Sequence, residues 1–571
     1  MRILLYNWAP FDDPEQRGGG VRVYENNLIE HLESGDHEIS VLSSGLEYDL
    51  MDQRVRIEPT TNTHGDKVRS YALVNSTVLA PGHHSFGSPQ VFAEGEMLTV
   101  WHNFLRQRGP FDVVQFDSLE GIPLTFLRVH EATFDTQVVV YAHNYYIVCP
   151  QVNLWKDERV HCDDYHGGRD CVTCLQHKPN AREVERAHQL SRLLRSVGIQ
   201  PGRPAYASAY SLYAWVKPRK RLFRALTAVG MMGFALSRPR SVPRVAHAVV
   251  GHVTEREPRL EPIRGVLQIA PSTSGGATDP GRSLSLASVF RERRERSVAL
   301  VNAEVDAVLA TSHRSRRVLA KYDIAEEKLK VAYIGTKAAE DFSRADRRKD
   351  LLVSGQLSLA YLGYMRRDKG FFFLLDALEA CPPELRSHLR LVVAARGFDP
   401  QAMERLSALA DSMVDVVHYD GYTHAELPRI LRTVDVGVIP VQWEDNLPQV
   451  AIEMASNGVP LITSHRGGAR ELGGDNPQFV FTGSSAPGLI EIWRRVLEGE
   501  LEPGDYWSSA MTPVTMEEHS AQLLELYADL LATRTTRRAA ALERHSVDVT
   551  RRQPAEAGGA GRATGVSLRG A

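Results

Sequence analysis

Residues 2–8 read RILLYNW, a glycine turn follows at 18–20, and residues 21–32 read VRVYENNLIEHL, which carries apolar residues at helical spacing. Residues 38–43, EISVLS, have the pattern of a second strand. A strand, a glycine turn, a helix and a strand in this order open a doubly wound parallel sheet. The first part of the chain is therefore predicted to be a Rossmann-like α/β domain, with further strands at 112–116 and 137–142.

A second α/β series begins near residue 357. Its strand candidates, most of them separated by helical segments, are 357–363, 391–395, 416–419, 434–440, 459–463 and 478–481. This alternation predicts a second parallel sheet with helices on both faces and with ligands at the carboxyl ends of its strands. The chain has 571 residues, which suits two such domains plus additional segments.

The predicted boundaries follow from composition. An N-terminal domain is expected over 1–340, and it contains an insertion at about 176–295 that is rich in Arg, Pro, Ser and Gly and lacks β/α alternation. A C-terminal domain is expected over 350–510, followed by a closing helix within 511–536. Residues 537–571 hold few large apolar groups and are predicted to form a disordered tail.

Composition excludes several classes of protein. Hydrophobic residues make up 43% and charged residues 24% of the chain, as in soluble globular proteins. The formal net charge of −3 argues against a nucleic-acid partner for the whole protein. The N-terminus lacks the pattern of a signal peptide, and no apolar run reaches the roughly 18 residues that a spanning helix needs, so a cytoplasmic location is expected.

Three motifs in the second domain each follow a predicted strand. The first is GYMRRDKG at 363–370, which puts Lys369 at the mouth of the next helix with Arg366 and Arg367 close by. A cation at this place would neutralise a diphosphate. The alternative is a solvated basic turn.

The second motif is WEDNLPQVAIEMASNGVP at 443–460. Pro448 fits the first turn of a helix, so Asp445 falls on the preceding loop and Glu453 about two turns later. Both can face the cleft, where one carboxylate can accept from two sugar hydroxyls. The alternative is that these acids only interact with the dipole at the start of the helix. This alternative fits Glu444 better than Glu453, because apolar residues flank Glu453 and a charge among them is costly unless it is paired.

The third motif is SHRGGARE at 464–471. Gly467 and Gly468 open a helix, and paired glycines let backbone N–H groups approach an anion. The alternative is a simple tight turn.

In order and spacing these motifs resemble the donor-binding half of glycosyltransferase family 4, which has the GT-B fold. The family pattern is G-R-x4-K-G, E-x7-E, G-x-P and G-G-x-x-E, and this chain has at those places GYMRRDKG, Asp445 to Glu453, 458–460 and 467–471. The likeness covers roughly two-thirds of the chain, and it includes residues 310–335, 420–440, the glycine loop at 18–20, and YAHNYYIVCPQVNLW at 141–155.

The resemblance implies an α/β protein of the GT-B fold, with two Rossmann-like domains that face each other across a cleft. It implies a retaining glycosyltransferase that moves a sugar from a nucleotide-diphosphate donor to a glycan, lipid-linked or small-molecule acceptor. No cofactor or metal is implied for catalysis, and no D-x-D stands at a strand end. The departing phosphate is then a candidate to take the acceptor proton.

The resemblance also assigns roles to residues. Lys369 would bind the donor diphosphate, Glu453 the nucleotide ribose, and Asp445 the donor sugar. Gly18, Gly19 and Gly20, together with the turn at 467–468, would border the diphosphate. His143 matches a histidine that lies near the reacting carbon, and the alternative for it is a hydrogen-bonded core histidine.

The chain departs from the family pattern at three places. Tyr364 stands where the family has arginine, for which Arg366 or Arg367 would substitute. Asp445 stands where the family has glutamate, and Glu444 is an alternative working acid. The turn after 391–393 reads AARG in place of a glycine-rich sequence. A nucleotide-sugar epimerase of the same fold and a non-catalytic member that binds a sugar nucleotide are therefore competing interpretations.

Four cysteines lie within 26 residues, and two of them form a Cys-x-x-Cys pair: Cys149, Cys162, Cys171 and Cys174. Four thiols match the ligand count of a structural zinc site, with His161 and His166 as alternative ligands. The competing interpretation is four unlinked reduced thiols.

Residues 215–244 contain eight Lys or Arg and no acid around a short apolar centre. Such a segment is too short to span a bilayer, and it suits peripheral contact with an anionic membrane, at its inner face for a cytoplasmic protein. The alternative is a buried helix with basic flanks.

Overall fold

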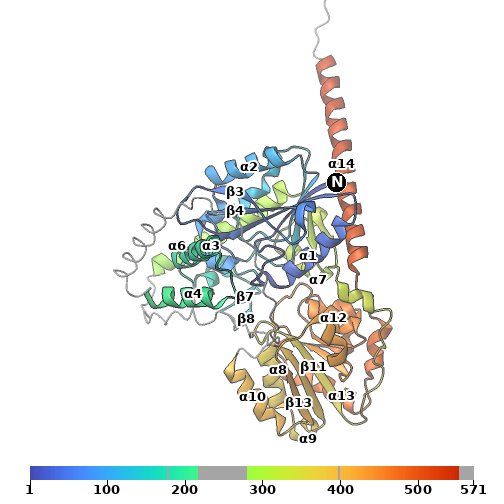
Figure 1. Ribbon diagram of the computed structural model, residues 1–571. Coiled ribbons are helices and arrows are strands. Elements are labelled where there is room, and N and C mark those ends of the chain that lie inside the picture. The colour runs from blue at the N-terminus through green and yellow to red at the C-terminus, as the bar shows by residue number, and fades with distance from the viewer. Residues whose placement is uncertain (158, 176–178, 217–279, 396–398, 552–571) are drawn as a thin grey trace, which may run out of the picture. The chain divides into compact units, whose positions relative to one another are not determined.

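The computed structural model describes residues 1–157, 159–175, 179–216, 280–395 and 399–551. The chain divides into two compact units, Met1–Ser520 and Ala521–Ala571. The first unit holds both α/β domains (Figure 1). The described part of the second unit is helical and belongs to α14 (Met516–Arg551).

The N-terminal domain is built on an eight-stranded sheet. The strand order is β10-β9-β6-β5-β1-β2-β4-β3, and every neighbouring pair is parallel except β3 and β4. The strands are β1 (Arg2–Tyr6), β2 (Glu38–Glu47), β3 (Arg56–Thr60), β4 (Val68–Val74), β5 (Val113–Phe116), β6 (Gln137–Ala142), β9 (Ala307–Ala310) and β10 (Leu329–Val331). The central strands β5 and β6 are buried along their whole length, which explains their continuous apolar sequence.

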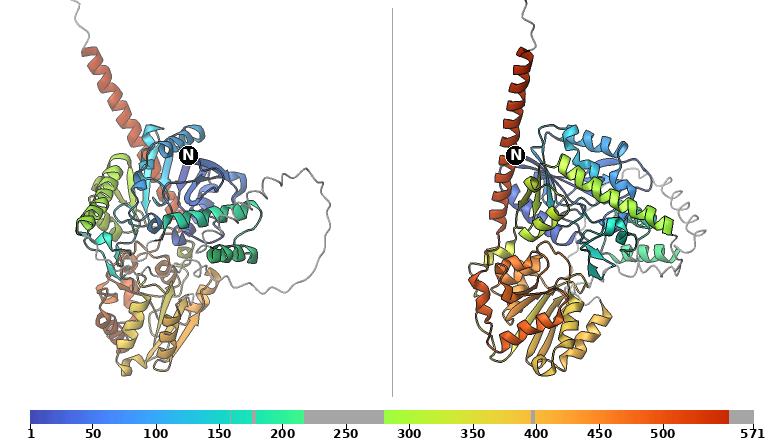
Figure 2. Two further views of the ribbon diagram at one scale, coloured as in Figure 1. Left: turned by 90° about the vertical axis from the view of Figure 1, so that its left-hand side faces the viewer. Right: turned by 180° about the vertical axis from the view of Figure 1, so that it is seen from behind.

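The helices of this domain connect and cover its strands. They are α1 (Gly19–Glu33), α2 (Glu96–Arg108), α3 (Ala181–Ser196), α4 (Pro204–Val216), α6 (Pro280–Glu304) and α7 (His313–Lys321). The green helices α3 and α4 lie side by side in both views of Figure 2, where the Tyr210 hydroxyl donates to the Ala187 carbonyl at 2.7 Å. A small hairpin joins β7 (Trp155–Lys156) and β8 (Val160–His161).

The C-terminal domain has a six-stranded sheet in the order β13-β12-β11-β14-β15-β16, with all neighbours parallel. Its strands are β11 (Leu357–Gly363), β12 (Leu389–Ala395), β13 (Asp415–Tyr419), β14 (Val436–Ile439), β15 (Leu461–Ser464) and β16 (Val480–Phe481). Its helices are α8 (Phe371–Ala380), α9 (Pro383–Arg386), α10 (Pro400–Ala410), α11 (Leu427–Leu431), α12 (Gln449–Ser456) and α13 (Ala486–Leu497). The predicted α/β class, with two domains that are each built on a largely parallel sheet, is confirmed.

The predicted end of the insertion at residue 295 falls inside α6, which begins at Pro280. Arginines of this helix are buried rather than solvated. Arg293 Nη2 donates to the Tyr146 carbonyl and Arg294 Nε to the Val148 carbonyl, both at 2.7 Å. Because its sequence is rich in arginine, α6 was not predicted as a helix that packs on the loop after β6.

The tail also differs from its prediction. α14 continues to Arg551, past residue 537, where the sequence predicts disorder to begin. Residues 537–551 are rich in Ala and Arg, which have high helix propensity even where little apolar surface is available.

The predicted membrane-contact segment 215–244 lies outside the described residues apart from Trp215 and Val216, which end α4. None of the helices in the described part of the chain has the length and apolarity that a membrane crossing requires.

Candidate functional site

A cavity of about 620 Å³ lies where the carboxyl ends of β11 and β14 meet the beginnings of α1 and α12. The N-terminal domain contributes Gly19, Gly20, Arg22 and His143 to its lining. The other side is lined by the C-terminal domain, including Tyr364, Lys369, Tyr422, Asp445 and Glu453. The sequence predicts a ligand at this edge of the sheets.

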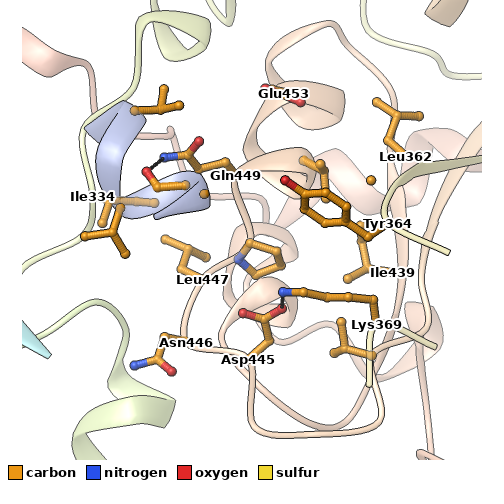
Figure 3. Close-up of a pocket in the computed structure, with 18 of the residues that line it drawn as sticks. Ile334, Leu362, Tyr364, Lys369, Ile439, Asp445, Asn446, Leu447, Gln449 and Glu453 are labelled. Atoms are coloured by element: carbon orange, nitrogen blue, oxygen red, sulfur yellow. Dashed lines mark hydrogen bonds and ion pairs between the residues drawn. The ribbon is translucent and has the colours of Figure 1, made fainter. Parts of the chain in front are cut away.

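Lys369 and Asp445 form an ion pair inside the cavity. Lys369 Nζ lies 2.6 Å from Asp445 Oδ2 and 5.2 Å from the centroid of the Trp443 ring (Figure 3). Gly370 follows at φ +79° as the N-cap of α8, and a Cβ atom there would lie 1.7 Å from the Pro440 carbonyl oxygen. This glycine lets the loop pack closely, which holds Lys369 at the mouth of the helix.

Glu453 lines the cavity from α12, and in the view of Figure 3 Tyr364 lies between it and the Lys369–Asp445 pair. Glu453 Oε2 accepts a hydrogen bond of 2.8 Å from the Tyr422 hydroxyl. Burial raises the pKa of Glu453, against the opposing effect of that hydrogen bond. The carboxyl group keeps a second oxygen for a ligand hydroxyl.

The start of α1 supplies backbone donors at the cavity. Gly19 and Gly20 are its first two residues, and the N-cap Gly18 has φ +85° and makes no side-chain capping hydrogen bond. The first N–H groups of a helix and its dipole favour an anion. Gly19 and Gly20 lie in the lining of the cavity and Gly18 does not, and the contact of these glycines with a diphosphate stays a prediction.

Arg366 and Arg367 are absent from the lining, contrary to the prediction. Arg366 is held by Asp368 through contacts of 2.9 and 2.7 Å, and Arg367 lies over the Phe372 ring, 4.7 Å from its centroid. Both side chains point elsewhere because the local acid and the local ring bind them. The lining has instead a second cation from the other domain, Arg22.

Arg22 is not predicted from the sequence, where its only signal is a position two residues after the glycine turn. Its Nη1 atom donates to the Phe11 carbonyl at 3.2 Å, and its buried Nε atom has no hydrogen-bond partner. Arg22 therefore supplies positive charge near the start of α1.

Glu444 has a structural role rather than the predicted ligand contact. It is 2% exposed and is absent from the lining of the cavity. The Arg314 guanidinium donates to its two oxygens at 2.8 and 2.5 Å, and Gly467 N–H donates to it at 2.9 Å. Burial opposes ionisation, but the contacts with Arg314 and Gly467 prevail and lower the pKa of Glu444.

The Gly467–Gly468 turn also lies outside the lining. The Gly467 N–H is bound by Glu444, and the Gly468 N–H donates to the Asp445 carbonyl at 2.8 Å. A Cβ atom at Gly467 would lie 2.3 Å from the Asp445 carbonyl oxygen, and one at Gly468 would lie 2.2 Å from that of Asn446. The predicted anion role of the turn is therefore corrected: these glycines let it pack against the loop that carries Asp445.

The same turn joins the two domains through Glu471, which sequence analysis quoted only as part of a motif. Glu471 accepts from the backbone N–H groups of His313 and Arg314 at 2.9 and 2.6 Å, at the start of α7. Asn446 Nδ2 donates to the Ala142 carbonyl at 2.8 Å, and Gln449 Nε2 to the Gly20 carbonyl at 3.0 Å. The loop that carries Asp445 is thus fixed from both domains.

His143 directly follows β6 and lies in the lining of the cavity. Its ring contacts those of Tyr141 and Tyr24, with centroids 4.2 and 4.7 Å apart. Its Nε2 atom lies 3.6 Å from Asp117 Oδ1 and has no hydrogen-bond partner. The role of His143 in the site stays a prediction.

The four clustered cysteines are buried free thiols. Burial raises the pKa of Cys162 to about 11 and the pKa values of Cys171 and Cys174 to about 12. A zinc ligand has to be a thiolate. Within the residues that the structure describes, no three His, Cys, Asp or Glu side chains are grouped to hold a metal ion. The structural zinc site stays a prediction from spacing.

Residues 356–498 match the family model described as Glycosyl transferases group 1. The match covers the domain that carries Lys369, Asp445 and Glu453.

Two curated relatives are similar over parts of the chain. Spore coat protein SA of Bacillus subtilis (strain 168) is 23% identical over 186 residues, which is 30% of this chain and 49% of that protein. Glycogen synthase of Mycobacterium tuberculosis is 33% identical over 125 residues, which is 21% of this chain and 28% of that protein. The chain thus spans half or less of the length of the relatives it matches.

Solved structures resemble the whole chain more remotely. The alignment with the solved complex of Anabaena HepE with UDP covers 93% of this chain and 100% of the HepE chain, at 14% identity and a TM-score of 0.46. Sucrose-phosphate synthase from Thermosynechococcus elongatus covers 93% and 100% at 14% identity and a TM-score of 0.49. Likeness at this level bears on neither activity nor substrate.

Proposed function

We propose that this protein is a glycosyltransferase that takes its sugar from a nucleotide-diphosphate donor bound in the 620 Å³ cavity. The observation that carries the proposal is the placement of Lys369 and Glu453 in one cavity, inside the segment that matches the glycosyltransferase family model. Lys369 would bind the diphosphate and Glu453 the ribose.

Charge around the Lys369 end of the cavity supports this orientation of the donor. Breaking the bond between sugar and diphosphate leaves negative charge on the phosphate, and fixed cations and N–H dipoles stabilise that charge. Lys369, Arg22 and the N-terminus of α1 supply them from both domains. Arg22 would then compensate for the arginine that Tyr364 replaces.

The acids in the lining support transfer with retention of configuration. They are Asp445, which is paired with Lys369, and Glu453, which is bound by Tyr422. Neither is a carboxylate free to activate an acceptor from the opposite face of the sugar. The departing phosphate would take the acceptor proton, and the acceptor would enter on the side of His143. A glycan, a lipid-linked sugar or a small molecule remains the proposed acceptor class.

The test is a transfer assay with a panel of nucleotide sugars and candidate acceptors, on the wild-type protein and the Lys369→Ala variant. We expect turnover in the wild type and a loss of about 100-fold or more in the variant, as for other groups that stabilise developing charge. Arg367→Ala is the matched control, because Arg367 carries the same charge outside this cavity. Equal turnover in wild type and Lys369→Ala would contradict the assignment.

The dependence on acceptor separates this proposal from its alternatives. An epimerase would convert the donor without an acceptor. A non-catalytic member of the family would bind the donor and leave it unchanged.

A further inference from the structure

A buried polar cluster lies beneath His143. It consists of Asn7, Glu25, Asp117 and His143. Asn7, Asp117 and His143 are the first residues after β1, β5 and β6, which are adjacent parallel strands, so their side chains meet at the carboxyl edge of the sheet. Glu25 reaches the cluster from α1. Glu25 is 0% exposed and Asp117 1%, and a buried carboxyl group needs compensation.

The contacts inside the polar cluster satisfy only part of each side chain. Asn7 Nδ2 donates to Glu25 Oε2 at 3.1 Å, and Gln115 Nε2 donates to Asp117 Oδ1 at 2.9 Å. Four buried atoms are left without a hydrogen-bond partner: Asn7 Oδ1, Glu25 Oε1, Asp117 Oδ2 and His143 Nε2.

Three of these four atoms are oxygens, and an ionised carboxylate only accepts hydrogen bonds. If Glu25 and Asp117 were both ionised, the polar cluster would hold two buried negative charges and three acceptor atoms without a hydrogen-bond partner, with the His143 imidazole 3.6 Å from Asp117. A proton on one carboxyl group removes a charge and supplies the donor that the oxygens lack. Two carboxyl groups that share a site commonly hold one proton between them.

We propose that Glu25 and Asp117 share one proton beneath His143, and that Glu25 is a positioning residue that keeps a single negative charge facing the His143 imidazole. Electrostatics agree with this geometry. Burial, and then the charge of Asp117, raises the pKa of Glu25 well above the ordinary value of a glutamate. Burial also raises the pKa of Asp117, against the opposing effect of His143.

Further titratable groups act on the polar cluster from the elements around it. The charge of Asp12, in the loop after β1, also raises the pKa of Glu25. His519 acts from α14 through His143 and Tyr24, whose hydroxyl lies 2.8 Å from His519 Nε2. Burial and the charge of His143 lower the pKa of His519 to about 3, so His519 is neutral near neutral pH and adds no charge.

The consequence for transfer rests on the proposed function. When Glu25 loses its proton, a second negative charge appears in the polar cluster beneath His143. We therefore expect the profile of kcat/KM against pH to have an inflection above the ordinary pKa of glutamate, and we expect Glu25→Gln to remove it. A purely structural role of Glu25 would change stability without removing an inflection.

The direct test is infrared spectroscopy of the full chain across a pH series, with difference spectra between variants that follow the carbonyl band of protonated carboxyl groups. The wild-type minus Glu25→Gln spectrum should show one carboxyl group that is still protonated at pH values well above 4.5, the ordinary pKa of glutamate. When the same difference spectrum is recorded with Asp117→Asn present in both proteins, the Glu25 carboxyl should titrate about one pH unit or more lower, because the negative charge of Asp117 is gone.

Glu453→Gln is the matched control. Glu453 is a half-buried glutamate with a raised pKa and one side-chain hydrogen bond, and it lies in the other domain. Its difference spectrum should titrate at the same pH with and without Asp117→Asn. If Asp117→Asn does not fold, His143→Gln replaces it and should shift the Glu25–Asp117 titration upward, because the imidazole that stabilises the carboxylate is lost.

Two results would overturn the shared proton. One is a Glu25→Gln difference without a protonated carboxyl group near neutral pH, and the other is a titration that neither Asp117→Asn nor His143→Gln moves. The infrared experiment needs neither donor nor acceptor. If the protein transfers sugar but the spectra show no proton shared by Glu25 and Asp117, this inference alone is refuted. If the spectra show the shared proton but the protein transfers no sugar, the proposed function alone is refuted.

Discussion

At the scale of single residues, Glu453 gives the site a pH dependence. Its pKa is raised by burial, so the folded protein binds this proton more tightly than the unfolded chain does. The stability that the neutral carboxyl contributes is fully present below the unfolded pKa and is lost as pH rises through the folded pKa. Ionisation of Glu453 therefore destabilises the empty cavity and leaves a carboxylate that can accept from a ligand hydroxyl.

We expect Glu453→Gln to become progressively more stable than the wild type as the pH is raised from about 4.5 to the folded pKa, by about 1.4 kcal/mol for each unit of the shift. The measurement is the free energy of unfolding in urea at several pH values. Glu426→Gln is the control, because Glu426 is exposed and the hydrogen bonds from Thr423 lower its pKa. The free energy of unfolding of Glu426→Gln should therefore not rise relative to the wild type over this pH range. A constant difference between wild type and Glu453→Gln at every pH would contradict the account.

At the scale of elements, the Gly467–Gly468 turn tests whether packing or ligand binding requires its glycines. Gly467→Ala places a methyl group 2.3 Å from the Asp445 carbonyl oxygen at φ +74°, so both strain and overlap arise. Gly499→Ala is a matched control with the same φ of +74° and no atom within 4 Å. We expect Gly467→Ala to lose about 1–3 kcal/mol more than the control in thermal or urea unfolding, because overlap adds to backbone strain. Equal losses would show that the close packing of this turn is not needed.

Most elements were predictable from sequence because their patterns are regular. β6 and β11 begin and end at the predicted residues, since continuous apolar runs bounded by turns mark buried parallel strands. β3 and β4 were missed. β3 is an edge strand that contains Pro59 and pairs antiparallel with β4, so its sequence lacks the apolar signal. α6 was missed because its buried arginines bind backbone carbonyls, a partnership that depends on the tertiary fold.

The position of a candidate site residue was predictable only where its side chain lines the cavity. Lys369, Asp445, Glu453 and His143 line the cavity as the motifs indicated. Glu444 and the Gly467–Gly468 turn were wrongly assigned, because their partners come from distant parts of the chain and local spacing does not reveal them. Arg22 was missed for the same reason: its role depends on how the start of α1 faces the other domain.

At the scale of the Met1–Ser520 unit, the Arg314–Glu444 pair joins the two α/β domains. The pKa of Glu444 is lowered, so its contribution to stability is present above the unfolded pKa and is lost as pH falls through the folded pKa. We expect Arg314→Ala to destabilise this unit by about 1–3 kcal/mol at pH 7, because the buried Glu444 carboxylate loses its closest partner and keeps Arg466, at 3.5 Å, as the remaining cation. The loss should shrink on acidification.

The double variant Arg314→Ala with Glu444→Gln is the control for that prediction. It removes the unpaired charge and should recover part of the stability, as followed by urea unfolding at pH 7. A double variant that is less stable than Arg314→Ala alone would contradict the interpretation of Glu444 as a paired structural acid.

The most direct test of the central claim is a thermal-shift panel with UDP, GDP, ADP, TDP and CDP on the wild type and on Lys369→Ala. A ligand that binds only the folded state raises Tm by mass action. We predict that one nucleotide raises Tm of the wild type clearly and that the rise is much smaller for Lys369→Ala, because its diphosphate loses the ammonium group. If no nucleotide at millimolar concentration shifts Tm of the folded wild-type protein, the cavity is not a nucleotide-diphosphate site and the proposed transferase activity is contradicted.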